Sequence, residues 1–409
     1  MSRRPRNPIR DLRGAARLAV VGSTAAVEVA EAVHSTIRGR RMNRQRPVSA
    51  PVYRRIREVA RIAGAGIDRS LAPLEALVAE STPGVRRAAL IAALNGVVGD
   101  HLAETSNPLA VSMRFSRGGE PLDPDPASLR SALPDLTGKI VVLLHGLCSN
   151  DQFWLRQGHD YGEALARDLG YTPIDLNYNT GKHIAENGRE FSALMEQLVQ
   201  GWPVPVEDLV LLGHSMGGLV ARSACHYSEQ PSPRQWRSKL TTLICLGTPH
   251  HGAPLERGGN GLQTIAGISP YLAPLARLGK LRSAGITDLR YGAFLDGHCV
   301  GRDRFDPVGD TREMIDLPAG VKCYAIAGTL SIRGRLHPLG DGLVPIASAL
   351  GQHRDPRLAL NFPVENTHIV TETGHLDLLG SAEVYRTIKD WLAAPLALEA
   401  PKALEAPKN

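Results

Sequence analysis

The chain has few cysteines and no long apolar run, and each shortage argues against a class of protein. Its 409 residues include five cysteines, which are widely spaced and form no C-x-x-C motif. Such a set does not build a disulfide framework, so we expect buried free thiols in a reducing compartment. The longest apolar stretches, 18–29 and 88–98, are rich in alanine and glycine. Both are shorter than the roughly 18 residues expected of a membrane helix, so no transmembrane span is predicted.

Acidic and aromatic residues are scarce in the first part of the chain. Residues 1–60 hold fourteen arginines against four acidic residues, and Tyr53 is their only aromatic. Nucleic-acid binding is not expected, because no base-reading motif accompanies the arginines. Two interpretations stay open: a helical layer that packs on the main domain, or a basic segment, 38–57, that contacts an anionic membrane. Glu28 and Glu31 argue against a secretory signal, so we predict a cytoplasmic protein, with peripheral contact at the inner membrane face under the second interpretation.

The pattern of apolar residues changes near residue 107, and it sets the fold class. Before that point the sequence predicts helices over 12–37, 52–65, 70–79 and 85–102. After it, predicted strands alternate with amphipathic helices. The expected strands are 109–115, 139–144, 172–178, 208–214, 240–246, 321–327 and 367–371, and the expected helices are 161–169, 187–200 and 382–391. Repeated βα units of this kind predict an α/β protein with a mostly parallel sheet and helices on both faces.

We therefore divide the chain into three parts. Residues 1–105 form a basic N-terminal helical region, 106–395 form the main domain, and 396–409 form a disordered tail with a short tandem repeat. Within the main domain, residues 250–319 are inserted between two strands and contain an apolar helical stretch at 262–281. This insertion is either a lid over the site or a packing element that does not move.

The stretch Asp208–Arg222 carries the chemistry. An apolar strand stops at Gly213, Ser215 stands at the bend, and Gly217 and Gly218 open a helix of small residues. Glycines two residues before and after a serine permit a sharp strand-turn-helix that holds the hydroxyl out at the sheet edge. We therefore predict that Ser215 is a nucleophile.

A serine nucleophile needs an imidazole base and a carboxylate that orients it, in the chain order serine, acid, histidine on this type of sheet. Asp341 lies between two glycines after a strand, and His375 follows the last short strand. We predict Asp341 as the orienting acid and His375 as the general base. Other acids and other bases remain as alternatives. They are Asp288, Asp306 and Asp310 for the acid, and His337, His353 and His368 for the base.

Two backbone N–H groups are predicted to stabilise the oxyanion. One belongs to Met216, directly after the nucleophile. The other belongs to Leu147, in the loop His145–Ser149 after the first long parallel strand, where Gly146 permits a sharp turn. We call residues 145–149 the oxyanion loop.

Together these motifs resemble the α/β-hydrolase fold of lipases and esterases, in particular bacterial lipases and the group similar to GPI inositol-deacylases. The resemblance covers 139–392 and leaves out 1–105. It rests on His145-Gly146-Leu147, on Gly213–Arg222, on Leu246–Gly252, on Asp341–Pro345 and on Gly374-His375. It implies attack of Ser215 on an ester carbonyl, an acyl-enzyme, and hydrolysis by water activated at His375.

The resemblance also raises the question of a metal. Some bacterial lipases hold calcium with an aspartate two residues after the histidine, where this chain has Asp377, but no second ligand matches. We therefore predict no metal and no cofactor, and expect Asp377 to cap the last helix. His250 and His251 are adjacent in sequence and are expected to line the mouth of the pocket.

The predicted function is hydrolysis of acyl esters or lipid-like substrates. Two alternatives remain: a thioesterase or amidase with the same three residues, and a non-catalytic binding module with a hydrolase-like fold.

Overall fold

A computed structural model describes residues 85–229, 234–253, 283–290, 292–298, 315–332, 335–336 and 340–394. The helices predicted before residue 85, the tail and most of the insertion 250–319 lie outside the described residues. The same holds for three of the alternative site residues, which are Asp306, Asp310 and His337.

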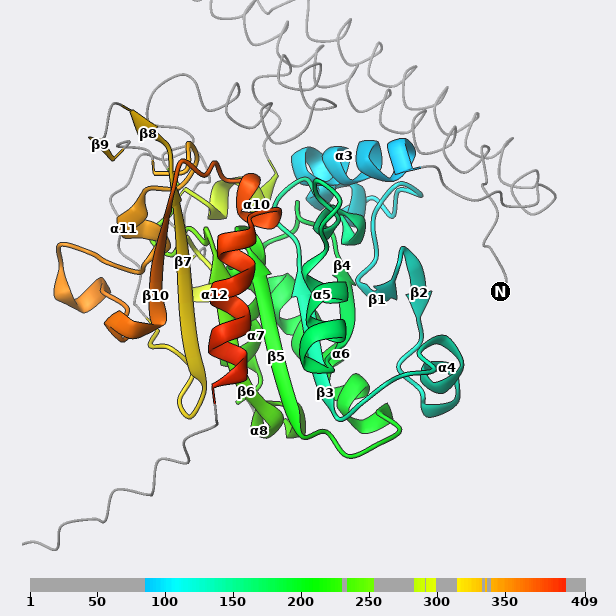
Figure 1. Cartoon of the computed structure of the whole chain (residues 1–409). Helices are drawn as coiled ribbons and strands as arrows, with labels where there is room; N and C mark the ends of the chain where they lie inside the picture. Colours follow the sequence, from blue (N-terminus) through cyan, green and yellow to red (C-terminus); the bar gives the residue numbers. More distant parts are fainter. Residues whose placement is uncertain are drawn as a thin grey trace, which may run out of the picture.

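The molecule is built on an eight-stranded sheet in the order β10-β7-β6-β5-β3-β4-β1-β2 (Figure 1). The strands are β1 (Arg114–Arg117), β2 (Glu120–Leu122), β3 (Lys139–Leu144), β4 (Thr172–Asn177), β5 (Asp208–His214), β6 (Leu240–Leu246), β7 (Lys322–Thr329) and β10 (Thr367–Thr371). The six from β3 to β10 pair in parallel, and β1 joins β4 antiparallel. This confirms the predicted α/β class and its mostly parallel sheet. A separate two-stranded hairpin joins β8 (Ser331–Ile332) to β9 (Arg335–Leu336).

Helices cover both faces of the sheet. The longer ones are α3 (Val85–Glu104), α5 (Tyr161–Leu169), α6 (Ile184–Gly201), α7 (Met216–Tyr227) and α12 (Ala382–Ala393). The shorter ones are α4 (Pro126–Ala132), α8 (Gln235–Lys239), α10 (Ala284–Asp288) and α11 (Ile346–Ala349). In Figure 1, α5 and α12 lie in front of the sheet, and α6, α7 and α8 lie behind it.

Alternate side chains of the central strands enter two separate cores. Ile140 and Val142 of β3 pack with the side chains of α6 and α7, whereas Val141 and Leu143 pack with those of α5 and α12. Because side chains alternate along a strand, a strand buried on both faces is a continuous apolar run. That is why the run in β3 could be recognised from the sequence.

Two element starts differ from the prediction by three residues or more, each because a side chain takes up the backbone groups concerned. The first strand begins at Arg114 and not at residue 109. Asn95 of α3 donates to the Leu109 carbonyl and accepts from the Val111 N–H. Helix α6 begins at Ile184, before the predicted residue 187, because the Asp288 carboxylate accepts the Ile184 N–H.

Helix α3, the described part of the predicted N-terminal region, packs into the core behind the sheet. Ala93, Val97 and Leu102 are buried in that core. The helix is kinked at Val98, whose φ of −136° is not helical. Together with α10, α3 lies at the top of Figure 1, above the ends of the strands.

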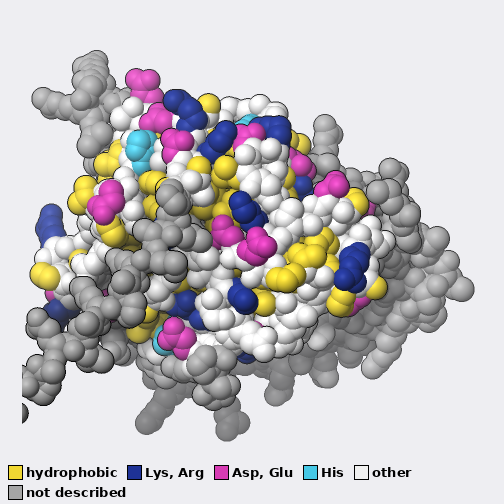
Figure 2. Space-filling model, turned by 60° about the horizontal axis from the view of Figure 1, so that its bottom comes forward, with side chains coloured by type: hydrophobic (Ala, Val, Ile, Leu, Met, Phe, Trp, Pro, Cys, Tyr) yellow, Lys and Arg dark blue, Asp and Glu magenta, His cyan; other side chains and the backbone are white. Residues whose placement is uncertain are grey.

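The surface at the lower end of the molecule is mixed in charge. Figure 2 brings this end forward, and basic and acidic side chains there are interspersed with apolar ones. Charges of both signs partly cancel at a distance, so this face is not the strongly basic surface that a polyanion would favour.

Two sequence-based statements can be checked across the described residues. No helix among them is both long and apolar enough to cross a membrane. Four of the five cysteines are described, and all four are free and buried, as predicted; they are Cys148, Cys225, Cys245 and Cys323.

Candidate active site

Ser215 stands at a strained turn between β5 and α7. Its φ is 55° and its ψ is −122°, in a region that few residues other than glycine occupy. A Cβ on Gly217 would overlap the Leu144 carbonyl oxygen, and one on Gly213 would lie 2.5 Å from the Gly218 nitrogen. The glycines therefore let α7 start directly against the strands, which turns the serine out of the sheet.

The oxyanion loop follows β3, the strand next to β5, and lies beside the serine. A Cβ on Gly146 would be 3.1 Å from the Ser215 Cβ. Within the described part of the chain, neither the Leu147 N–H nor the Met216 N–H donates to an acceptor, although both residues are buried. Buried N–H groups are nearly always paired, so two unpaired ones beside a serine are suited to receive an oxygen of a ligand.

Asp341 and His375 are in direct contact. The His375 Nδ1 donates to the Asp341 Oδ2 at 2.7 Å, and both side chains are almost fully buried. The other carboxylate oxygen, Oδ1, accepts the N–H groups of Leu343 and Val344 at 3.0 and 2.8 Å. The His375 N–H donates to the Asp341 carbonyl at 3.0 Å. These bonds fix both the carboxylate and the Nδ1–H tautomer of the imidazole.

This pair lies next to the serine turn. The Ser215 N–H donates to the Leu246 carbonyl, and the next residue, Gly247, faces the pair. A Cβ on Gly247 would be 3.2 Å from both the Asp341 Oδ2 and the His375 Cε1. The imidazole and the carboxylate thus lie over Gly247, at the carboxyl ends of adjacent parallel strands, where ligands bind in open α/β sheets.

Two further histidines support this arrangement, and both are neutral. The His214 Nε2 donates to the His375 carbonyl at 3.0 Å, and burial lowers the pKa of His214 well below its usual 6.5. The His145 Nδ1 donates to the Gly146 carbonyl, and burial lowers the pKa of His145 to about 4. Tyr178 stacks on the His145 ring and donates its hydroxyl to the His145 carbonyl. The contacts of His145 and Tyr178 that hold the oxyanion loop therefore involve uncharged groups.

The described alternatives for the acid and the base lie elsewhere. Asp288 accepts from the His183 Nδ1 and the Ile184 N–H at the start of α6. His368 contacts Glu383 at 3.0 Å, and His353 lies on the exposed side of a turn with Asp355. None of these four bonds involves Ser215, Asp341 or His375.

Two smaller predictions were wrong. Ser381 caps α12 by accepting the Val384 N–H, while Asp377 opens a preceding short helix and lies 3.5 Å from Arg156. His250 is fully buried, with its ring against Phe362 and its Nδ1 3.3 Å from Arg222. It is a core histidine and does not line the mouth of a pocket. No group of three or more histidine, cysteine or acidic side chains in the described residues is arranged to hold a metal ion.

Sequence reasoning missed the residues that hold the oxyanion loop from outside. The Thr180 hydroxyl accepts the Cys148 N–H at 3.1 Å, and the Cys148 Sγ lies against Gly96 of α3. These contacts join segments far apart in the chain, and no motif in the sequence marks them. The one weak signal is the glycine-rich end of α3, with Gly96 and Gly99 in one helix.

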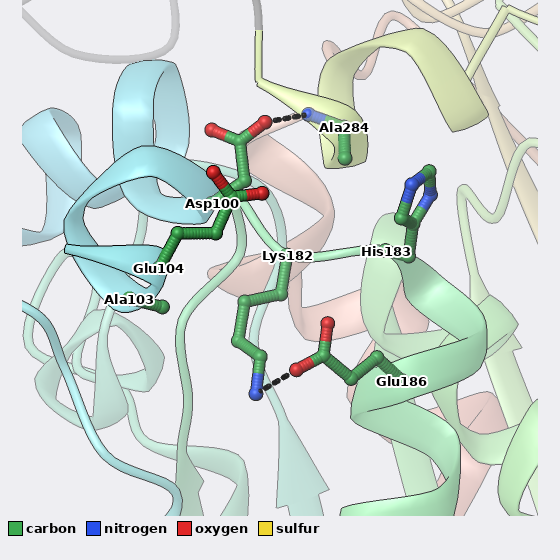
Figure 3. A pocket seen from close by; sticks show the side chains of 7 residues that line it. All are labelled: Asp100, Ala103, Glu104, Lys182, His183, Glu186 and Ala284. Atoms are coloured by element: carbon green, nitrogen blue, oxygen red, sulfur yellow. Dashed lines mark hydrogen bonds and ion pairs between the residues drawn. The ribbon is translucent and has the colours of Figure 1, made fainter. Parts of the chain in front are cut away.

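A cavity of about 340 Å³ lies between α3, the start of α6 and α10 (Figure 3). Its lining residues are Asp100, Ala103, Glu104, Lys182, His183, Glu186 and Ala284. Lys182 forms an ion pair with Glu186 across its floor. None of the predicted catalytic residues lines this cavity, so it is separate from the serine turn.

Known protein families and solved structures match parts of this chain. Residues 177–287 match the model of the PGAP1-like alpha/beta domain, which is less than half of the chain. No curated protein sequence matches. Among solved structures, the mature lipase BlEst2 of Bacillus licheniformis is 18% identical, covers 69% of this chain and 98% of its own, and has a TM-score of 0.41.

Two other solved structures are similar to this chain at comparably low sequence identity. EstA of Clostridium botulinum is 13% identical, with 66% of this chain and 91% of its own covered and a TM-score of 0.37. The Staphylococcus hyicus lipase is 16% identical, with 63% and 95% covered and a TM-score of 0.33. These likenesses are distant, and the function is therefore inferred from the geometry of the site.

Proposed function

We propose that the chain is a serine ester hydrolase that cleaves acyl esters or lipid-like substrates. Ser215 is the nucleophile, His375 the general base and Asp341 the orienting acid, and the N–H groups of Leu147 and Met216 bind the oxyanion. The observation that carries the proposal is the 2.7 Å contact between His375 and Asp341, both beside the strained turn at Ser215.

The first half of the reaction forms an acyl-enzyme. His375 Nε2 takes the proton of the Ser215 hydroxyl while Oγ attacks the ester carbonyl, since Nδ1 already donates to Asp341. The negative charge on the carbonyl oxygen is stabilised by the two unpaired N–H groups. His375 then gives the proton to the departing alcohol, and the acyl group stays on Ser215.

The second half releases the acid. Water enters in place of the alcohol, and His375 removes its proton as the water oxygen attacks the acyl carbonyl. The bond to Ser215 Oγ then breaks, His375 returns the proton to Oγ, and the carboxylic acid leaves. Each step uses backbone donors that are in place before the substrate arrives, so little reorganisation is needed during the reaction.

A series of p-nitrophenyl esters of increasing chain length tests the proposal. The wild type is expected to hydrolyse at least part of the series, and Ser215→Ala is expected to lose about 10⁴-fold or more in kcat. Ser238→Ala, at an exposed position in α8, is the matched control and is expected to keep full activity. Turnover of thioesters or amides alone would favour the thioesterase or amidase alternative, and no turnover of any acyl substrate would favour a binding module.

A further inference from the structure

We infer that helix α3, outside the segment that resembles hydrolases, positions the oxyanion loop, with Gly96 and Cys148 as the positioning pair. The inference rests on the proposed function, because it concerns the loop that carries the Leu147 N–H. It assigns a role in the reaction to a part of the chain that the family motifs leave out.

The first evidence is the close approach of α3 to the loop. A Cβ on Gly96 would overlap the Cys148 Sγ and lie 3.0 Å from both the Cα and the Cβ of Cys148. Only a glycine in α3 leaves room for the loop at this distance. Cys148 is buried, and its Sγ, Cα and Cβ are the atoms nearest to Gly96. The surface of α3 therefore sets the position of Cys148.

The second evidence is the backbone conformation of the loop. Cys148 has a φ of 59°, which is uncommon for a residue with a side chain and is kept only where the surroundings enforce it. The Cys148 N–H donates to the Thr180 hydroxyl, and the Ser149 N–H donates to the Gly146 carbonyl. Among the N–H groups of residues 147–149, only that of Leu147 has no acceptor in the described part of the chain. This N–H is therefore available to a ligand.

The third evidence is that Thr180 itself belongs to a turn fixed on α3. The Asn179 amide donates to the Gly99 carbonyl at 2.8 Å, and its oxygen accepts the Gly181 N–H. Side chains at Gly99 or Gly181 would overlap the opposite segment. Helix α3 therefore contacts the oxyanion loop twice, directly through Gly96 and through the turn 179–181.

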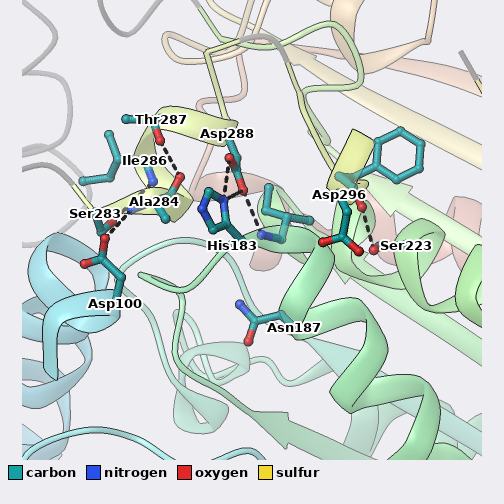
Figure 4. A network of polar contacts seen from close by, with 12 residues as sticks. Asp100, His183, Asn187, Ser223, Ser283, Ala284, Ile286, Thr287, Asp288 and Asp296 are labelled. Atoms are coloured by element: carbon teal, nitrogen blue, oxygen red, sulfur yellow. Dashed lines mark hydrogen bonds and ion pairs between the residues drawn. The ribbon is translucent and has the colours of Figure 1, made fainter. Parts of the chain in front are cut away.

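Helix α3 is also bonded to α10, as Figure 4 shows for Asp100 and Ala284. The Ser283 hydroxyl donates to the Gly96 carbonyl at 2.6 Å, and the Ala284 N–H donates to Asp100 at 2.9 Å. The kink at Val98 interrupts the regular helical pattern between these two contacts. Because the Gly285 N–H of α10 also donates to the Gly181 carbonyl, α3, α10 and the turn 179–181 are joined to one another, and α3 cannot move away from the loop without breaking these bonds.

The test is a double-mutant cycle at Gly96 and Cys148. Gly96→Ala would normally favour a helix. Here its methyl group displaces the sulfur, so kcat is expected to fall at least about tenfold, with KM within about twofold of wild type. Cys148→Ala loses packing and is expected to lower kcat about two- to fivefold. In Gly96→Ala/Cys148→Ala the overlap with sulfur is gone, and kcat is expected to recover most of the Gly96→Ala loss.

Two further measurements separate positioning from general damage. Leu102→Ala, in the same helix but in the core, is expected to lower the unfolding temperature while kcat stays within about twofold of wild type. Alkylation by N-ethylmaleimide, read by mass spectrometry at Cys148, is expected to be at least about tenfold faster in Gly96→Ala than in wild type, because the displaced loop exposes the thiol.

The outcomes are distinct. Unchanged kcat in Gly96→Ala, or no recovery in the double variant, would overturn the role of α3 while ester hydrolysis by the wild type upholds the proposed function. A wild type that hydrolyses no ester overturns the proposed function and this role with it, even if Cys148 alkylation still responds to Gly96→Ala.

Discussion

The Nε2 of His214 lies 3.0 Å from the backbone carbonyl oxygen of His375, and the two rings are 4.7 Å apart. The residue before the nucleophile thus holds the residue proposed as its base. Burial keeps His214 neutral, so its Nε2–H acts as a fixed donor and does not compete for the proton that His375 would take.

Replacing His214 tests this link. His214→Phe keeps a ring but removes the donor, so we expect kcat to fall about tenfold with little change in KM, since a small shift of the base is costly. His214→Gln keeps an N–H near the Nε2 position and is expected to stay within about threefold of wild type. Steady-state kinetics of both variants check this, and equal losses in the two would show that the bond does not position His375.

Asp341 gives a second prediction. Asp341→Asn keeps the shape of the side chain but can hold the wrong tautomer of His375, so kcat at neutral pH is expected to fall about 10³- to 10⁴-fold. Asp377→Asn, two residues beyond His375 and paired with Arg156, is the matched control and is expected to change kcat less than about threefold. A similar loss in both variants would argue against a special role for Asp341.

The glycines of the turn give a prediction about stability. A methyl group on Gly217 would overlap the Leu144 carbonyl oxygen and lie 2.8 Å from the His145 carbonyl oxygen. Backbone atoms cannot move aside easily, so Gly217→Ala is expected to lower the free energy of unfolding by about 2 kcal/mol or more and to abolish activity. Gly297→Ala, where a Cβ would meet no atom of the described residues within 4 Å apart from its chain neighbours, is the control and is expected to be neutral in urea unfolding. Full stability of Gly217→Ala would contradict the described packing of the turn.

The buried carboxyl of Asp175 in β4 gives a pH dependence. Burial raises its pKa to about 8, so the folded protein holds a proton there that the unfolded chain releases above its ordinary pKa of 3.8. This group therefore costs stability increasingly as the pH rises from about 4 to 8. Asp175→Asn is expected to be more stable than wild type at pH 8, with a several-fold smaller gain at pH 5. Urea unfolding at both pH values measures this, and an equal gain at both would rule out the raised pKa.

Much of the fold and the immediate surroundings of Ser215 could be predicted because short segments determine them. The apolar runs of β3 and β5 are buried on both faces, and they stand out in the sequence for that reason. The turn at Ser215 is likewise local, since Gly213, Gly217 and Gly218 all act within three residues of the serine. The positions of Asp341 and His375 after strands predict their roles, and the structure places the two side chains in contact.

What the sequence did not predict depends on contacts between distant segments. Asn95 of α3 takes up the backbone of residues 109–111, which shortens β1. Asp288, in the insertion, lengthens α6 by accepting the Ile184 N–H. The contact of Gly96 with Cys148 joins the end of the N-terminal region to the oxyanion loop. Periodicity and spacing describe one segment at a time, and such pairings appear only when the chain is folded.

Reaction with a fluorophosphonate probe tests the central claim most directly, because the probe forms a bond only with an activated serine. Intact mass and peptide mapping of the wild type are expected to show one adduct, on Ser215. Ser215→Ala is expected to form none, and His375→Ala to react at least about 100-fold more slowly. A folded wild type that forms no adduct, or one that carries it on another serine, would contradict the assignment of Ser215 as the nucleophile.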